Sequence, residues 1–256
     1  MMKRTLIGAL VVALALIGTG CDSKVALDAP TVAATVINDG ATLHLTWDQV
    51  TNAKSYEIKA GDSTYTTEAT SLDVSNPVAA IEVRSVSGNS KSDSAVVNCK
   101  VVESTVEFYG DLDYVNPHSS GFGFATSGSA DTFMLSYPSY LSMDFYADGK
   151  SSAGEMRLIS AGNLNSSSKG NGIQAASGSY DDAKLAGSPG SYSSPLAVTV
   201  DSTYYLRISP DQDTIPTWST NDNYAKAKVV SITSDSLKVT LKLGYQKIAG
   251  LRWLGH

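Results

Sequence analysis

The sequence predicts an all-β protein with two domains, a smaller β-sandwich followed by a larger antiparallel β-sandwich or barrel. Short segments of alternating apolar and polar residues recur along the chain, which is the pattern of half-buried strands. Gly, Ser, Asn, Asp and Pro separate these segments, and no stretch beyond the N-terminal leader has the apolar spacing of a helix. The length of 256 residues is also enough for two domains.

The N-terminus has the charge and hydropathy order of an export signal. Lys3 and Arg4 precede an apolar stretch from Leu6 to Ile17, which is too short to span a bilayer. The following Gly-Thr-Gly-Cys resembles the lipobox of bacterial lipoproteins, and this resemblance implies cleavage before Cys21 and lipidation of its thiol. The alternatives are an uncleaved helical anchor and a soluble signal with an incidental cysteine.

The leader also predicts where the protein resides. Residues 1–20 are expected to be a signal peptide and residues 21–29 a tether, so the exported chain would be lipid-anchored to a bacterial membrane. Asp22 resembles an inner-membrane retention signal of some Gram-negative bacteria, which leaves inner and outer leaflets open. The net charge of −6 argues against nucleic acid as a partner. Cys99 is predicted to be a small buried hydrophobe.

The first domain is predicted over residues 30–102. In "LHLTW", Leu43, Leu45 and Trp47 share one face of a strand, and in "KSYEIKAG" Tyr56 and Ile58 do the same. The stretch "AGDSTY" is predicted to connect a hairpin.

These segments resemble a fibronectin type III module, with Pro at the entry, Trp on the second strand, Ala-x-Ser-Tyr-x-Ile on the third and Val-Arg-x-Val-x-Gly-x-Ser late in the domain. The resemblance implies a two-sheet sandwich that acts as a spacer or a binding scaffold. Ala79 occupies the place of the family's usual corner tyrosine, so that hydrogen bond is expected to be missing.

The second domain is predicted over residues 104–256. Its strand candidates are "TVEFYGDLDYV", "TFMLSY", "YLSMDFYADG", "MRLIS", "PLAVTV", "TYYLRI", "KAKVVSI" and "SLKVTLKLGYQ". The last of these alternates most cleanly, with Leu237, Val239, Leu241, Leu243 and Tyr245 on one face. Between residues 149 and 194, twenty of 46 residues are Gly or Ser, which predicts long exposed loops able to hold a ligand.

Residues for catalysis are scarce, so we predict no enzyme and no catalytic residue. The histidines are His44, His118 and His256, and none adjoins a nucleophile motif or has zinc-ligand spacing. Glycoside hydrolysis needs only two carboxylates and is kept as a third functional hypothesis, although spacing nominates no pair.

Acidic pairs raise the alternative of a weak calcium site. The pairs are Asp111 with Asp113, Asp144 with Asp148, and Asp211 with Asp213. None forms a recognised calcium loop, so we expect solvated surface carboxylates and neither a metal nor a cofactor.

Aromatic residues of the second domain favour a sugar ligand. They are Tyr137, Tyr140, Tyr146, Tyr180, Tyr192, Tyr204, Trp218 and Tyr224. Sugar rings stack on exposed aromatic rings while nearby Asp and Asn bind hydroxyl groups. The loop "PTWSTNDNY" combines these residue types, which makes Trp218, Asp222, Asn223 and Tyr224 candidate ligand-binding residues. The alternative is that Trp218 closes one end of the sandwich.

The C-terminal stretch suggests a second type of ligand. "NYAKAKVVSI" followed by "LKVTLKLGYQ" resembles the end of the HmuY-like haem-binding lipoproteins. That family binds haem through two histidines, and here the resemblance leaves His118 as the candidate. We therefore expect a membrane-tethered binding or structural protein that recognises carbohydrate or another surface ligand, such as a surface protein. Capture of haem or another apolar ligand is the alternative.

Overall fold

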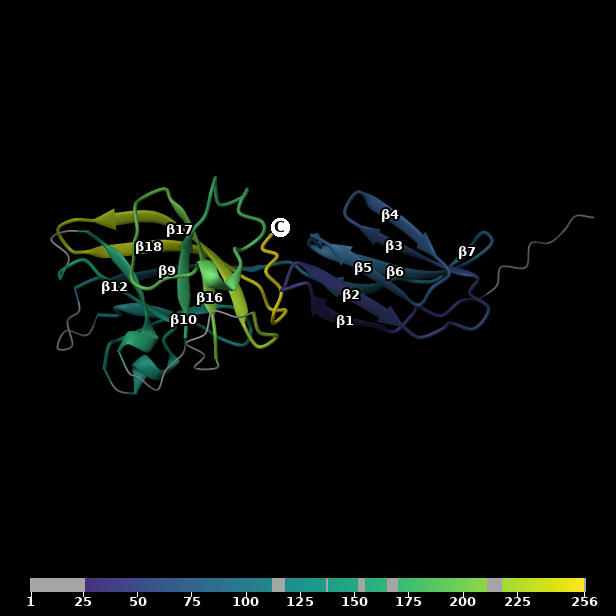
Figure 1. The fold of residues 1–256 in the computed structure, drawn as a ribbon, viewed down its shortest axis with the longest axis horizontal. Helices are drawn as coiled ribbons and strands as arrows, with labels where there is room; N and C mark the ends of the chain where they lie inside the picture. Colours follow the sequence, from purple (N-terminus) through teal and green to yellow (C-terminus); the bar gives the residue numbers. More distant parts are fainter. Residues whose placement is uncertain are drawn as a thin grey trace, which may run out of the picture.

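A computed structural model describes residues 26–111, 118–136, 138–151, 155–164, 170–210 and 218–255. It confirms the all-β prediction, because the described chain forms antiparallel sheets and only short 3-10 helices. The strands form two sandwiches side by side, with β1 to β7 labelled in one and β9 to β18 in the other (Figure 1). Among the described residues, no helix is both long and apolar enough to cross a membrane.

The first domain has two sheets. One contains β1 (Val32–Ile37), β2 (Thr42–Trp47) and β5 (Ser71–Ser75). The other contains β3 (Ser55–Ala60), β4 (Ser63–Thr67), β6 (Ala80–Ser87), β7 (Ser90–Lys91) and β8 (Ala95–Asn98). The predicted hairpin connection is confirmed, since only two residues join β3 to β4.

The core of this domain forms from the alternating residues that the sequence indicates. Leu43, Leu45 and Ile58 are fully buried, and Trp47 and Tyr56 are nearly so. The rings of Trp47 and Tyr56 meet edge to face with their centroids 5.4 Å apart. The period-two pattern of β2 and β3 therefore reports directly which side chains face the opposite sheet.

The second domain also has two sheets. The first contains β11 (Ala130–Phe133), β10 (Gly121–Phe124), β12 (Phe145–Asp148), β13 (Arg157–Ser160) and β15 (Leu196–Ala197). The second contains β14 (Gly172–Ala175), β16 (Thr203–Ile208), β17 (Asn223–Thr233), β18 (Lys238–Tyr245) and β9 (Val102–Tyr109). Strand β9 begins two residues before the predicted start of this domain.

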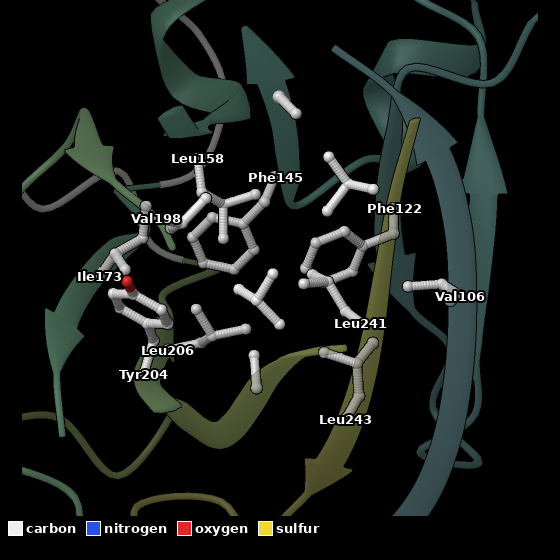
Figure 2. Packing of buried hydrophobic residues seen from close by; sticks show 14 of the residues in the cluster. Val106, Phe122, Phe145, Leu158, Ile173, Val198, Tyr204, Leu206, Leu241 and Leu243 are labelled. Atoms are coloured by element: carbon white, nitrogen blue, oxygen red, sulfur yellow. The ribbon is translucent and has the colours of Figure 1, made fainter. Parts of the chain in front are cut away.

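The two sheets enclose one apolar core (Figure 2). Val239, Leu241 and Leu243 of β18 point into it, as their alternation predicts. Phe122 and Phe145 come from the opposite sheet and are fully buried. This packing fixes the strand ends and the turns that carry the candidate site.

Two predictions for the second domain are partly wrong. "YLSMDFYADG" is not one strand, because the 3-10 helix η1 (Ser139–Ser142) precedes β12 and starts directly after Pro138. The Gly- and Ser-rich stretch is less exposed than expected. The predicted strand "MRLIS" coincides there with β13, whereas β14 was not predicted. Residues 176–192 bring buried Tyr180, Ala183 and Ala186 against the sheet of β16 and β17.

Candidate ligand-binding site

The loop proposed to bind sugar presents only part of its candidate residues to solvent. Tyr224 and Asp222 are fully buried, so their side chains are not accessible to a sugar. Trp218 is half-buried, and its indole Nε1 donates to the carbonyl of Gly250 at 2.9 Å. Asn223 is also half-buried and donates from Nδ2 to the carbonyl of Gln246 at 3.1 Å.

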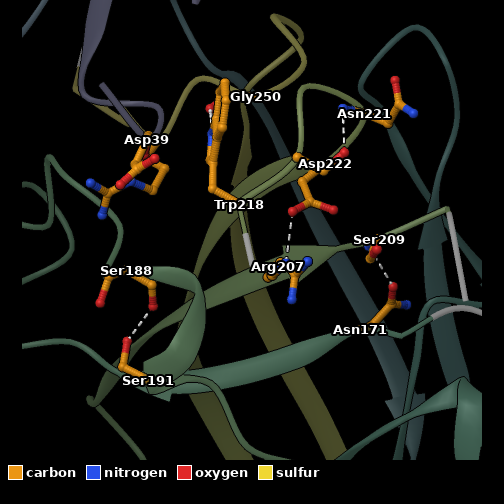
Figure 3. A network of polar contacts seen from close by, with 12 residues as sticks. Asp39, Asn171, Ser188, Ser191, Arg207, Ser209, Trp218, Asn221, Asp222 and Gly250 are labelled. Atoms are coloured by element: carbon orange, nitrogen blue, oxygen red, sulfur yellow. Dashed lines mark hydrogen bonds and ion pairs between the residues drawn. The ribbon is translucent and has the colours of Figure 1, made fainter. Parts of the chain in front are cut away.

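An ion pair explains why Asp222 lies inside the protein. Arg207 Nε on β16 donates to Asp222 Oδ2 at 2.8 Å, and both side chains are almost completely buried (Figure 3). Burial raises the pKa of the Tyr224 phenol above its ordinary range, and the nearby Asp222 carboxylate adds to this. These residues support the fold where the two domains meet. This is the kind of role that the alternative interpretation gives to Trp218, in which its ring closes one end of the sandwich.

Three of the six other candidate tyrosines are buried. Tyr146, Tyr180 and Tyr204 are buried, whereas Tyr140 and Tyr192 are half-buried. Tyr137 lies outside the described residues. The many aromatic residues of the second domain therefore indicate side-chain packing more than contact with a ligand.

Tyr180 packs between two lysines on the outer face of the sheet. Lys226 Nζ lies 4.3 Å and Lys242 Nζ 4.4 Å from the centroid of its ring. Lys226 Nζ also donates to the Tyr180 carbonyl at 2.9 Å. Gly244 makes room for this ring, because a Cβ there would lie 2.6 Å from the Tyr180 hydroxyl oxygen. Burial raises the pKa of Tyr180, and Glu103 adds to the effect.

Lys226 should make the free energy of unfolding of the protein measurably dependent on pH. Burial lowers its pKa from 10.5 to about 8 in the folded chain. The folded chain therefore loses this proton before the unfolded chain does, and the cost of burying the ammonium group fades as the pH rises above 8. The free energy of unfolding of the wild type should consequently rise relative to that of Lys226→Met between pH 8 and pH 9.5 in urea titrations.

A control separates this effect from general titration. Lys228 lies on the same strand, and its partly exposed ammonium group pairs with exposed Asp201. The stability of Lys228→Met should follow the wild-type pH curve. A Lys226→Met curve that also runs parallel to the wild type would contradict the assignment. The charged residues that act on Lys226 are Asp181, Glu103, Lys242 and Lys184.

His118 lines a pocket on the second domain. The pocket is open, has a volume of about 470 Å³ and is lined by Tyr109, Asp111, His118, Lys150, Asp235, Ser236 and Leu237. Three of these residues belong to the turn between β17 and β18, which lies at the end of the second domain away from the first (Figure 1). The pocket is thus formed at one end of the molecule.

Backbone hydrogen bonds hold the pocket walls together. Tyr109 N donates to the carbonyl of Ser119, and Gly110 N donates to the carbonyl of Leu237, each at 2.8 Å. Gly149 N donates to the carbonyl of Gly110 at the same distance. The end of β9, the segment before β10, the turn after β12 and the β17–β18 turn are thereby fixed to one another.

The pocket offers two kinds of contact. The rings of Tyr109 and His118 lie 4.5 Å apart between centroids, with 32° between their planes, and form an aromatic surface. Asp111 and Asp235 supply carboxylate oxygens that can accept hydrogen bonds, while Lys150 supplies a donor. An apolar surface with a few polar groups suits a ligand that has both a flat face and hydroxyl groups.

Histidine ligation of haem would rest on His118 alone among the described residues of this pocket. His44 lies on β2 of the first domain, where its Nδ1 is 2.5 Å from Asp73 Oδ1. His256 lies outside the described residues. The structure therefore does not bring a second described histidine to His118.

The acidic pairs do not form a metal site in the described part of the chain, where no group of three potential His, Cys, Asp or Glu ligands occurs. The expectation of solvated carboxylates is wrong for Asp144 and Asp148, which are buried. Asp144 Oδ2 accepts from Phe124 N at 2.8 Å, and Asp148 Oδ1 accepts from two backbone N–H groups of the next turn. Asp113, Asp211 and Asp213 lie outside the described residues.

The structure describes only one of the two cysteines, Cys99. Cys99 is a buried free thiol whose pKa is raised to about 12 by burial, so it is poorly suited to act as a nucleophile. Cys21, the predicted lipidation site, lies outside the described residues.

Comparison with known proteins adds no family assignment. No protein-family model matches the chain, and a search of curated proteins gives no match either.

Proposed function

We propose that the protein is an exported lipoprotein, tethered through Cys21, that binds carbohydrate in the pocket of Tyr109 and His118. The observation that carries the proposal is the combination of an accessible aromatic pair with two carboxylates and a lysine in one pocket. An aromatic face can stack on a sugar ring while nearby polar groups bind its hydroxyl groups, as in ligand pockets that combine apolar surface with a few placed polar groups.

The position of the pocket supports a tethered binding role. The first described residues lie at the outer end of the first domain, since the Asp28 carbonyl accepts from Ser85 Oγ beside β7. The pocket lies at the opposite end of the molecule, beyond β18 (Figure 1). A chain held by its N-terminus would consequently present the pocket away from the membrane.

Two pockets on the first domain are less suited to a sugar. One of about 370 Å³ contains Tyr56, but the ring of that tyrosine is buried in the core. The other, about 360 Å³, has Lys59, Val78 and Glu82 in its wall and no aromatic residue. Neither provides an exposed ring for stacking.

Ligand-induced stabilisation of the full chain in detergent tests the proposal. Melting is followed across a panel of polysaccharides, with haem and calcium as further members of the panel. A saccharide at 100 times its dissociation constant adds about 2.7 kcal/mol of stability, or roughly 5–10 °C. Tyr109→Ala and His118→Ala should each weaken binding about tenfold, which corresponds to about 1.4 kcal/mol.

His44→Ala is the matched control, because His44 is a partly exposed histidine of the first domain. It should bind the saccharide like the wild type. If no saccharide of the panel shifts the melting temperature, or if the shift survives both pocket substitutions, the carbohydrate proposal is overturned. In the same preparation, intact-mass analysis should find an acylated chain that starts at Cys21. An intact Met1 would contradict the lipoprotein assignment.

Haem is the second candidate, and the presence of His118 in the pocket favours it. This alternative expects a Soret absorbance shift on addition of haem that is lost in His118→Ala and kept in His44→Ala. A melting shift with haem but with no saccharide would select it.

A further inference from the structure

The C-terminal segment does not end on its own domain. Residues 246–255 leave β18 and return to the first domain, and the chain ends between the two sandwiches (Figure 1). Leu251 is fully buried within the same apolar cluster as Leu43, Leu45 and Ile58 of the first domain. Ile248 and Trp253 pack against that cluster as well.

Polar contacts join this segment to both domains. Arg252 N donates to the carbonyl of Gly40 at 2.9 Å, and Arg252 Nε donates to the carbonyl of Asp39 at 2.6 Å. The other end of the same side chain, Nη1, donates to the carbonyl of Ala186 in the second domain at 2.7 Å. One arginine thus bridges the β1–β2 turn and the segment that covers the second domain.

A buried glutamine continues the connection. Gln246 is fully buried, and its Nε2 donates to the Cys99 carbonyl at 2.9 Å and to the Trp253 carbonyl at 2.8 Å. Its Oε1 accepts from Ile248 N at 3.0 Å. The amide therefore satisfies backbone groups from the end of the first domain and from the C-terminal segment together.

The β1–β2 turn fits closely against the second domain. Gly40 has a φ of +85°, and a Cβ at this position would lie 2.4 Å from the carbonyl oxygen of Gly250 and 2.9 Å from Trp218 Nε1. Figure 3 shows Asp39, Trp218 and Gly250 gathered at this junction. Glycine permits both the backbone conformation and the close approach.

We infer that the first domain is a fixed arm, because residues 246–255 complete its core and hold both domains in one orientation. Independent domains are joined by exposed linkers with few contacts across the boundary. Here the connection between β8 and β9 contains buried Cys99 and Val101, and the C-terminal segment makes a second, non-covalent connection through buried Leu251. Two such connections resist bending and twisting in a way that one linker does not.

Distances between spin labels in the full chain test this inference. Val96→Cys on β8 and Val230→Cys on β17 place labels at exposed positions of the two domains. Chains with only one of these substitutions are controls, because a distance measured in them would reveal spin labelling of a natural cysteine. The doubly labelled chain should give one narrow distance distribution in pulsed electron paramagnetic resonance.

Two substitutions should broaden that distribution by different routes. Leu251→Ala removes the buried side chain, whereas Arg252→Ala removes the bridge to Asp39 and Ala186 without changing the core of either sheet. Leu141→Ala is the control, because Leu141 is exposed on the second domain. Circular dichroism establishes that each variant remains folded before its distances are measured.

The outcomes separate this inference from the carbohydrate proposal. A broad distribution in the wild-type background, or a narrow one that neither Leu251→Ala nor Arg252→Ala changes, would overturn the fixed arm. Saccharide affinity in solution should be unchanged in both variants, because neither residue lines the pocket. Failure of saccharide binding therefore leaves the distance result interpretable by itself.

Discussion

Replacing Asp222 by alanine is expected to lower the free energy of unfolding by about 3–5 kcal/mol. The substitution leaves the Arg207 guanidinium inside the protein without its carboxylate, and the Arg207 side chain is only 5% exposed. Removing one member of a buried ion pair is costly because the remaining charge has lost its water as well. Urea unfolding followed by tryptophan fluorescence measures this change.

Two further chains show whether the ion pair is responsible. The double variant Arg207→Met/Asp222→Leu removes both charges and should recover most of the lost stability. Glu155→Ala breaks the exposed pair with Arg157 and should cost no more than about 1 kcal/mol. If Asp222→Ala costs as little as Glu155→Ala, the buried pair does not stabilise this junction.

Phe122→Ala is expected to destabilise the second domain by about 3–5 kcal/mol. Phe122 is fully buried, and its ring centroid lies 5.4 Å from that of Phe108 and 5.6 Å from that of Phe145. These rings come from both sheets of the sandwich. Removing the Phe122 ring, which lies between the layers in Figure 2, therefore leaves a cavity there. A loss of this size lowers the melting temperature by roughly 6–20 °C in calorimetry.

Tyr65→Ala is the control for Phe122→Ala, since Tyr65 is 45% exposed on β4. It should change stability by no more than about 0.5 kcal/mol. Phe122→Leu fills more of the site than alanine and should fall between the two. Equal losses for Phe122→Ala and Tyr65→Ala would show that the two sheets repack without cost around the missing ring.

Strands with a clear alternation could be predicted from the sequence. "TYYLRI" coincides with β16, and the alternating residues of β18 face the core. Strand β10, with the sequence Gly-Phe-Gly-Phe, could not be recognised because glycine is depleted in strands. Strand β14 was hidden in the Gly- and Ser-rich stretch for the same reason.

The candidate site was less accessible to prediction. His118 stood out because histidine is rare in this chain, and Asp111 belonged to an acidic pair. Tyr109, Lys150 and Asp235 were missed as pocket residues, since they come from separate segments that only the fold brings together. No periodicity within one segment carries that information.

The burial of Asp222 was not predicted, for a related reason. A carboxylate in a loop rich in Asn, Ser and Thr is normally solvated. Its partner Arg207 lies 15 residues earlier on β16, and the alternation of that strand does not indicate a charge enclosed at its end. Burial of both groups is a property of the junction between domains.

The contact between Arg252 and Asp39 joins residues that are 213 positions apart. A newly made chain emerges N-terminus first, so the core of the first domain lacks Leu251 until the whole second domain has been synthesised. Leu251 then completes the apolar core that contains Leu43, Leu45 and Ile58. A chain truncated before Leu251 should therefore have a less stable N-terminal sandwich, because that sandwich would lack a buried core residue.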